Sequence, residues 1–120
     1  MGGKDQQALG AYGERVAARH LSELGMVVLD RNWRCPVGEL DLVLRDRDVL
    51  VFCEVKTRRG EARGHPLQAV DVIKVQRLRR LAALWIEEHE VVVDHVRIDA
   101  VGVTAPRRGP ATVVHSRGIG

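Results

Sequence analysis

Three carboxylates and a lysine interrupt two apolar runs in the middle of the chain. Residues Gly38–Thr57 read GELDLVLRDRDVLVFCEVKT, and the charged tip Arg45–Asp48 predicts a hairpin between two strands. Asp41 lies on the first of these strands, and Glu54 and Lys56 lie two positions apart on the second. Side chains two apart on a strand share a face, roughly 6.5–7 Å from each other. We therefore expect these three side chains to converge on one face of a sheet.

This grouping predicts phosphodiester hydrolysis, because buried carboxylates need a counter-ion or a metal. Magnesium prefers oxygen ligands, keeps several waters and takes one or two carboxylates. Asp41 and Glu54 are the predicted metal ligands, completed by the backbone carbonyl of Val55. Lys56 would orient the attacking water or neutralise developing charge. An acid-x-Lys triplet alone is weak evidence, since such pairs also occur as surface salt bridges.

Two helices are predicted to bring further charges to this face. Apolar residues recur at helical spacing from Gln6 to Leu24, and Glu14 falls at the border of that stripe. Glu14 either reaches over the sheet, where it could hold a metal-bound water, or forms a solvated helix flank. Asp71 is a good N-cap for a second helix over Val72–Glu88. Lys74 on that helix either extends towards Glu54 or snorkels outwards.

The segment TRRGEARGHPLQA after Lys56 has no apolar period and predicts a mobile loop beside the carboxylates. Arg58, Arg59 and Arg63 in this loop are expected to bind the phosphates of a nucleic acid, together with Lys74. A solvated charged loop without a ligand explains the same composition.

The remaining segments complete an α/β pattern in a single domain over residues 1–120, with residues 1–5 as a loose end. Met26–Asn32 predicts a strand, followed by a turn over WRCPVG. Alternating residues from Val91 to Val103, the turn APRRGP and the strand ATVVH predict a C-terminal hairpin. Arg97 and Asp99 in it are a surface or ion-paired feature. The expected order is α-β-β-β-α-β-β, a central mixed sheet flanked by helices.

Composition sets the expected partner and compartment. The net charge of +3 and a pI near 9.3 favour a polyanion, whereas 3% aromatic residues argue against extensive base stacking. Neither a long apolar run nor a signal-peptide core is present in the sequence, so we expect a cytoplasmic protein without a membrane partner. Cys35 and Cys53 have no metal-ligand spacing.

Several segments together resemble the YraN family of bacterial proteins, in this order along the chain: GxxGE (10–14), RNWR (31–34), GELDLV (38–43), FCEVKTR (52–58), Ala69-Val70 with Lys74, and RID (97–99). That family has a restriction-endonuclease-like fold and is similar to archaeal Holliday-junction resolvases. The resemblance implies Glu14, Asp41, Glu54 and Lys56 as catalytic residues, and magnesium or manganese as cofactor. It further implies an endonuclease acting on DNA, branched or otherwise structured DNA included, and leaves a homodimer open by analogy. This chain has Leu40-Asp41 where the superfamily has Pro-Asp.

Two other functions agree with the same residues, since a fold does not fix an activity. One is a nucleic-acid-binding module that keeps the nuclease fold without cleavage. The other is a protein–protein adaptor whose charged face is a structural ion-pair network.

Overall fold

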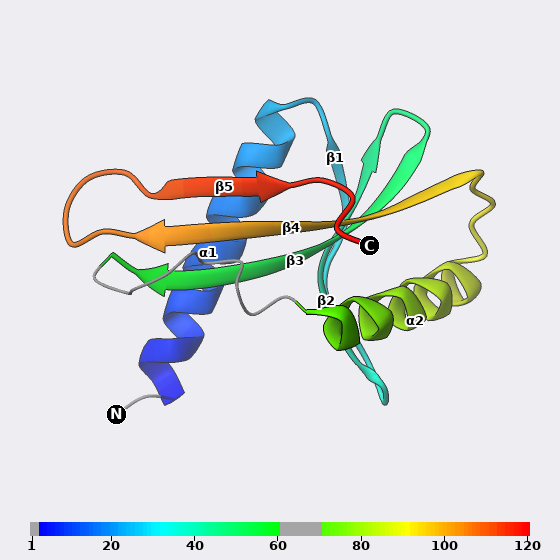
Figure 1. Ribbon diagram of the computed structural model, residues 1–120, viewed down its shortest axis with the longest axis horizontal. Helices are drawn as coiled ribbons and strands as arrows, with labels where there is room; N and C mark the ends of the chain where they lie inside the picture. The colour runs from blue at the N-terminus through cyan, green and yellow to red at the C-terminus, as the bar shows by residue number, and fades with distance from the viewer. Residues whose placement is uncertain (1–2, 61–70) are drawn as a thin grey trace.

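The computed structural model describes residues 3–60 and 71–120. Two helices and five strands follow the predicted order and confirm the mixed α/β class (Figure 1). They are α1 (Gly3–Glu23), β1 (Val27–Cys35), β2 (Gly38–Asp46), β3 (Val49–Arg59), α2 (Val72–His89), β4 (His95–Ala105) and β5 (Thr112–Ser116). Within the described part of the chain, neither helix has the length and apolar character needed to cross a membrane.

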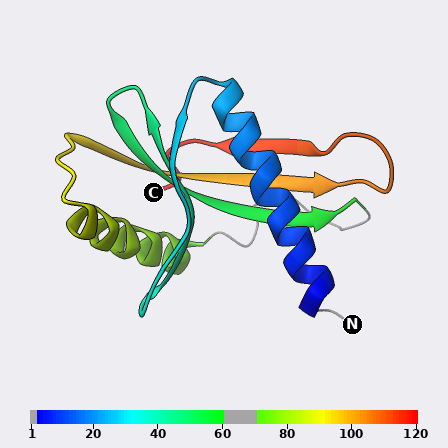
Figure 2. The ribbon, with the colours of Figure 1, turned by 180° about the vertical axis from the view of Figure 1, so that it is seen from behind.

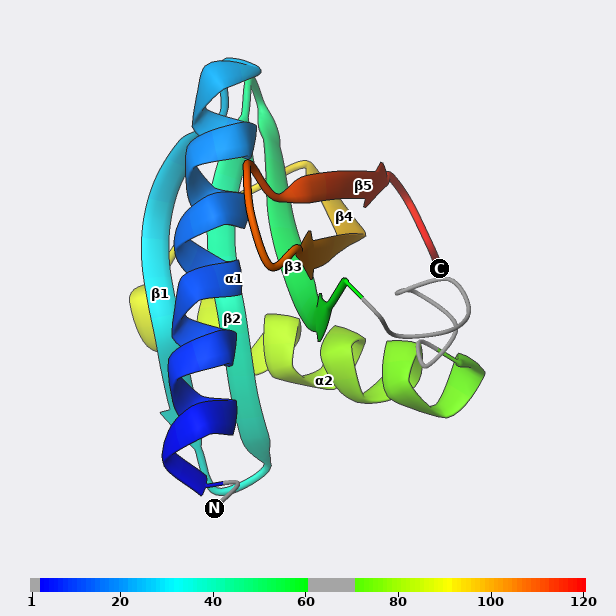
Figure 3. The same cartoon turned by 90° about the vertical axis from the view of Figure 1, so that its left-hand side faces the viewer.

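The five strands form one mixed sheet in the order β1-β2-β3-β4-β5. Neighbouring strands pair antiparallel except for β3 and β4, which run parallel and are joined through α2. The sheet twists strongly, so that the β1–β2 hairpin rises steeply across the direction of β4 and β5 (Figure 3). This twist opens the sheet where β2 leaves β3.

Each helix covers one face of the sheet. On one face α1 packs Ala17 and Leu21 against Leu42, Val51 and Val101, and Figure 2 shows it crossing the strands. On the opposite face α2 buries a second cluster, formed by Leu78, Leu81 and Trp85 with Leu40, Phe52 and Ile98. On β3 the side chains alternate between the two cores, with Val51 on the α1 side and Phe52 on the α2 side, as the period of two requires.

Several element boundaries differ from the sequence prediction, among them the following three. Helix α1 begins at Gly3, so residues 3–5 are not a loose end, and Asp5 in the first turn complements the helix dipole. Strand β1 continues through Cys35, because residues 33–35 pair with residues 38–40, which leaves only Pro36 and Val37 to turn the chain. Strand β4 begins at His95, since the residues before it pack irregularly against the core under α2.

Aromatic side chains fasten the C-terminal end of α2 to β1. The indole of Trp85 donates to Asp30 Oδ2 at 2.9 Å, and that of Trp33 donates to Glu88 Oε2 at 2.8 Å. The ring of His89 stacks on Trp85 with centroids 4.0 Å apart. These contacts fix the helix over β1, and thereby fix the position of its other end.

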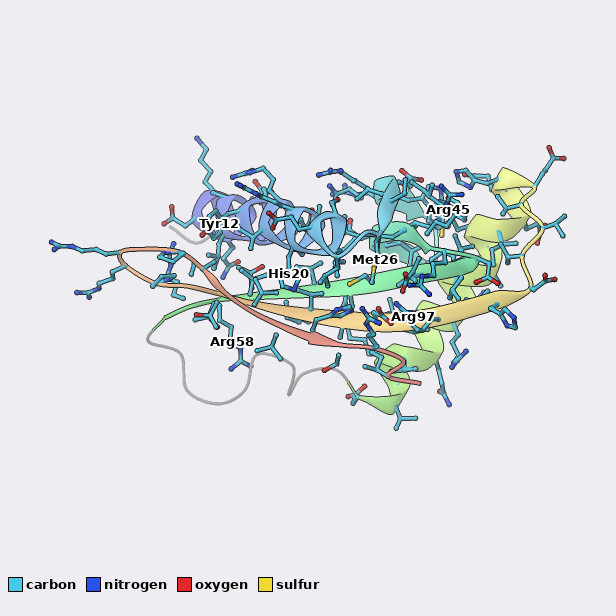
Figure 4. All side chains as sticks on the ribbon, turned by 90° about the horizontal axis from the view of Figure 1, so that it is seen from above. Tyr12, His20, Met26, Arg45, Arg58 and Arg97 are labelled. Carbon is cyan, nitrogen blue, oxygen red and sulfur yellow. The ribbon has the colours of Figure 1, made fainter. Side chains whose placement is uncertain are left out.

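Asp99 is fully buried and accepts several hydrogen bonds. Arg97 Nε donates to it at 2.8 Å, the Gly118 amide donates at 3.0 Å, and His115 Nε2 lies 2.9 Å from its Oδ2. Arg97, labelled in Figure 4, also lies 3.1 Å from Asp46 Oδ2. Burial would raise the pKa of Asp99, but the bonds from Arg97, Gly118 and His115 hold that pKa below its usual value. The ion-paired interpretation is confirmed, and Asp99 is not a surface residue.

Gly13 lets α1 approach β3, because a Cβ at this position would overlap the Thr57 side chain. We expect Gly13→Ala to lower the free energy of unfolding by about 1–3 kcal/mol through overpacking. Gly10, one helical turn earlier, has nothing within 4 Å of the same atom. Gly10→Ala is the matched control, and should raise that free energy by about 0.5–1 kcal/mol. Urea unfolding measures both, and equal effects would show that the close approach is unimportant.

Candidate active site

Asp41 and Glu54 lie where two strands of the sheet part. The β2–β3 ladder ends at the pair Leu42–Cys53, and the two carboxylates occupy the next position on each strand. Beyond this point β3 continues its pairing with β4. The backbone amide of Val55 donates instead to Asp41 Oδ2 at 2.8 Å. The Asp41 carboxylate thus accepts the hydrogen bond from β3 that the backbone of β2 no longer accepts.

The parting strands and α2 enclose a hollow of about 580 Å³, which we name the central hollow. The predicted residues Asp41, Glu54, Val55, Lys56 and Lys74 all line it. Asp41 and Glu54 are each 8% exposed, so their carboxylates are largely removed from water. The structure therefore brings together five of the residues that the sequence singles out.

Lys74 reaches Glu54 across the hollow. Its Nζ lies 2.7 Å from Glu54 Oε2, and the two side chains are 19% and 10% exposed. Asp71 caps α2 as predicted, with its Oδ1 accepting the Lys74 amide at 2.9 Å. Lys74 therefore extends over the sheet, and the alternative of an outward lysine is wrong.

Burial and the neighbouring charged groups shift the pKa values in the hollow. Burial, a hydrogen bond with Glu54 and the charge of Glu54 together raise the pKa of Asp41 to about 8. The Lys74 ammonium beside Lys56, together with burial, lowers the pKa of Lys56. Burial opposes the charged form of Lys74, yet its bond to Glu54 raises the pKa of Lys74 above the usual value. Two carboxylates and two ammonium groups thus share one hollow.

Glu14 lies in a neighbouring hollow on the α1 side, lined also by Arg31, Asn32 and Leu42. Burial raises the pKa of Glu14, a hydrogen bond from Asn32 opposes that rise, and the charge of Glu54 adds to it. Asn32 adopts a left-handed backbone with a φ of 50°, which short polar side chains tolerate. Glu14 is therefore half-buried within electrostatic reach of the central hollow, without lining it.

The predicted arginine loop is only partly a loop. Arg58 and Arg59 belong to β3, because β4 pairs with this strand as far as Ala105. Arg58 is labelled at that end of the sheet in Figure 4, and Arg59 lines a separate hollow beside α1. Arg63 lies outside the described residues. The sequence prediction of a loop is therefore wrong for Arg58 and Arg59.

Two arginines that the prediction did not assign to the site line the central hollow. Arg34 lies on β1 and pairs with Glu39 at 2.8 Å, directly across the hairpin. Arg77 lies on α2, three residues after Lys74. Helical spacing could have identified Arg77, since residues three apart share a helix face. Arg34 needed the hairpin register, which depends on where the turn falls.

The residues of the central hollow fit a magnesium or manganese ion. Across residues 3–60 and 71–120, no three or more His, Cys, Asp or Glu side chains group to hold a metal. Magnesium does not require such a cage, because it binds through one or two carboxylates and otherwise through water and substrate phosphates. Burial, together with the neighbouring Glu54, raises the pKa of Asp41 and so disfavours a second negative charge in the hollow. A divalent cation would compensate that charge.

Comparison with known proteins decides the family. Residues 13–103 match the profile described as "Uncharacterised protein family UPF0102". The chain belongs to the UPF0102 family. This is the YraN family that the sequence motifs resemble. The UPF0102 proteins of Nocardioides sp. (strain JS614) and Beutenbergia cavernae are 62% and 58% identical to the chain over 115 residues. Those alignments cover 96% of the chain and 93% and 98% of the two UPF0102 relatives.

Proposed function

We propose that this UPF0102 protein is a divalent-metal-dependent endonuclease that hydrolyses phosphodiester bonds in DNA. The observation that carries the proposal is the buried Asp41–Glu54 pair at the point where β2 and β3 part, with two lysines beside it. Burying these two carboxylates costs free energy, and apolar residues of similar volume would stabilise the fold at least as well. Perturbed carboxylates in a hollow are typical of functional sites.

Each side chain has a role in the proposed reaction. Asp41 and Glu54 would hold the metal, with the Val55 carbonyl as a further ligand. Bound magnesium or manganese supplies polarisation of the phosphate and a more acidic water. Lys56, with its lowered pKa, would orient the attacking water or donate to the charge that develops on the phosphate. Glu14, in the neighbouring hollow, would hold a water molecule at the edge of the site.

Positive charge around the hollow supports a nucleic-acid substrate. Arg34 and Arg77 are exposed and line the hollow that contains the carboxylates. Contacts from arginine and lysine to phosphates position a nucleic acid without reading its sequence. Arg58, Arg59 and Arg63 remain proposed phosphate contacts outside this hollow. Branched DNA as the substrate and a homodimer as the active form are proposals that rest on the family resemblance alone.

Cleavage of linear, flapped and four-way-junction DNA with magnesium or manganese tests the proposal. We expect Asp41→Ala and Glu54→Ala each to reduce the rate by roughly a hundredfold or more, since each removes a metal ligand. Asp48→Ala is the matched control, because it removes an exposed carboxylate from the tip of the same hairpin. Full activity in Asp41→Ala or Glu54→Ala would exclude that residue from the mechanism.

The ion pair between Lys74 and Glu54 favours one alternative, a nucleic-acid-binding module without cleavage. In that case the hollow is balanced by its own lysines and needs no metal. DNA binding that weakens with salt, together with no manganese binding at the hollow, would support this function instead.

A further inference from the structure

Glu54 already has a cation bound to it. The Lys74 ammonium lies 2.7 Å from Glu54 Oε2, a distance typical of a charge-assisted hydrogen bond. Both side chains are mostly shielded from water, so this pair is stronger than an exposed salt bridge. The oxygen that a divalent metal would use therefore has a competitor within the chain.

We propose that Lys74 is an internal counter-ion that occupies Glu54 in the metal-free protein, and that a divalent cation binding to Asp41 and Glu54 displaces it. This inference rests on the proposed metal site and describes how that site is regulated. Lys74 then acts as a positioning residue, which controls when Glu54 is available as a ligand.

The charges in the hollow explain the displacement. Lys74 binds Glu54, and Lys56 lies close enough to Lys74 for each ammonium to affect the other. A divalent cation at the two carboxylates would lie beside both ammonium groups, and like charges at such distances repel strongly where water is scarce. Repulsion is relieved when a lysine withdraws. Lys74 is the lysine whose ammonium lies on Glu54 Oε2, the oxygen that the metal would take.

The displaced Lys74 ammonium could bind a phosphate at the mouth of the central hollow. Lys74 precedes Arg77 by one helical turn, and both line the hollow from α2. A phosphate at the mouth of the hollow would accept the ammonium that Glu54 releases. Binding of the metal and of nucleic acid would then strengthen each other, because a coupling free energy acts equally in both directions.

Calorimetric titration with manganese tests the inference on the metal alone. We expect Lys74→Met to bind manganese roughly tenfold more tightly than the wild type, because the competing cation is gone. Arg80→Met is the matched control, since it removes from the same helix an exposed charge that does not line the hollow. Its affinity should change by roughly twofold or less, because water and salt screen an exposed charge. Circular dichroism confirms that each variant folds.

The rate of chemical acetylation gives a second measurement on the wild-type chain. Its lysines are Lys4, Lys56 and Lys74. Manganese should raise the acetylation rate of Lys74 severalfold, since an amine released from an ion pair becomes reactive. Lys4, exposed at the start of α1, serves as the internal reference. An unchanged Lys74 rate at saturating manganese would overturn the inference even if a variant failed to fold.

The outcomes separate this inference from the proposed function. Equal manganese affinity in the wild type and Lys74→Met overturns the displacement and leaves the metal site intact. Manganese binding by neither protein overturns both. Tighter manganese binding by Lys74→Met without DNA cleavage by the wild type supports the displacement and excludes the proposed nuclease activity.

Discussion

Asp99→Ala is expected to lower the free energy of unfolding by about 3–5 kcal/mol, because several hydrogen-bond donors around this fully buried carboxylate lose their acceptor. Asp99 is fully buried and accepts hydrogen bonds from Arg97 and from the backbone of Gly118. Its removal also weakens the attachment of the C-terminal segment, since the Gly118 amide loses its acceptor. Urea unfolding at neutral pH measures the loss.

The control for this prediction is Asp46→Ala, which removes the other carboxylate that pairs with Arg97. The side chains of Asp46 and Arg97 are each 21% exposed, so water replaces much of the lost interaction. We expect a cost of about 1 kcal/mol or less. If the two variants were equally destabilised, burial would not be what makes Asp99 important.

Asp41→Asn is expected to stabilise the metal-free protein at alkaline pH. The pKa of Asp41 is about 8 in the folded chain and 3.8 for an unperturbed aspartate. The folded state therefore holds this proton more tightly than the unfolded state does. The stability contributed by the protonated carboxyl is fully present below pH 3.8 and is lost as the pH rises through about 8.

Asparagine at position 41 stays neutral, so the free energy of unfolding of the variant should increasingly exceed that of the wild type as the pH rises. The difference in unfolding free energy should be near zero at pH 4 and reach about 2–4 kcal/mol at pH 9. Asp48→Asn at the exposed hairpin tip should show no such trend. Unfolding is measured with a chelator present, and a difference that does not change with pH would contradict the raised pKa of Asp41.

Much of the fold and the centre of the site follow from local patterns. The period of two places Asp41, Glu54 and Lys56 on the α2 side of the sheet, and the helical period places Lys74 above them. Asp71 supplies a chemical signal for the start of α2. These features depend on residues close in sequence, which is why the sequence reveals them.

The remaining features depend on tertiary contacts. Arg58 and Arg59 have no strand pattern of their own, and β4 makes them part of the sheet by pairing with them. Arg97 and Asp99 alternate like surface residues, and only the packing of β5 and the C-terminal segment buries Asp99. Arg34 reaches the central hollow because the strands part. Such contacts override local propensity, so a sequence pattern does not predict them.

Among the described strands only β3 and β4 pair in parallel, and the parts of the site differ in the chain entropy that is lost when they come together. Asp41 and Glu54 lie on a hairpin that closes through a two-residue turn, so little chain entropy is lost in bringing them together. Lys74 is carried by the α2 crossover, which must span the distance from β3 to the parallel strand β4. Contacts across a long chain segment form late, because loop closure must precede them. The carboxylates are therefore assembled by a local hairpin, and their counter-ion by a longer connection.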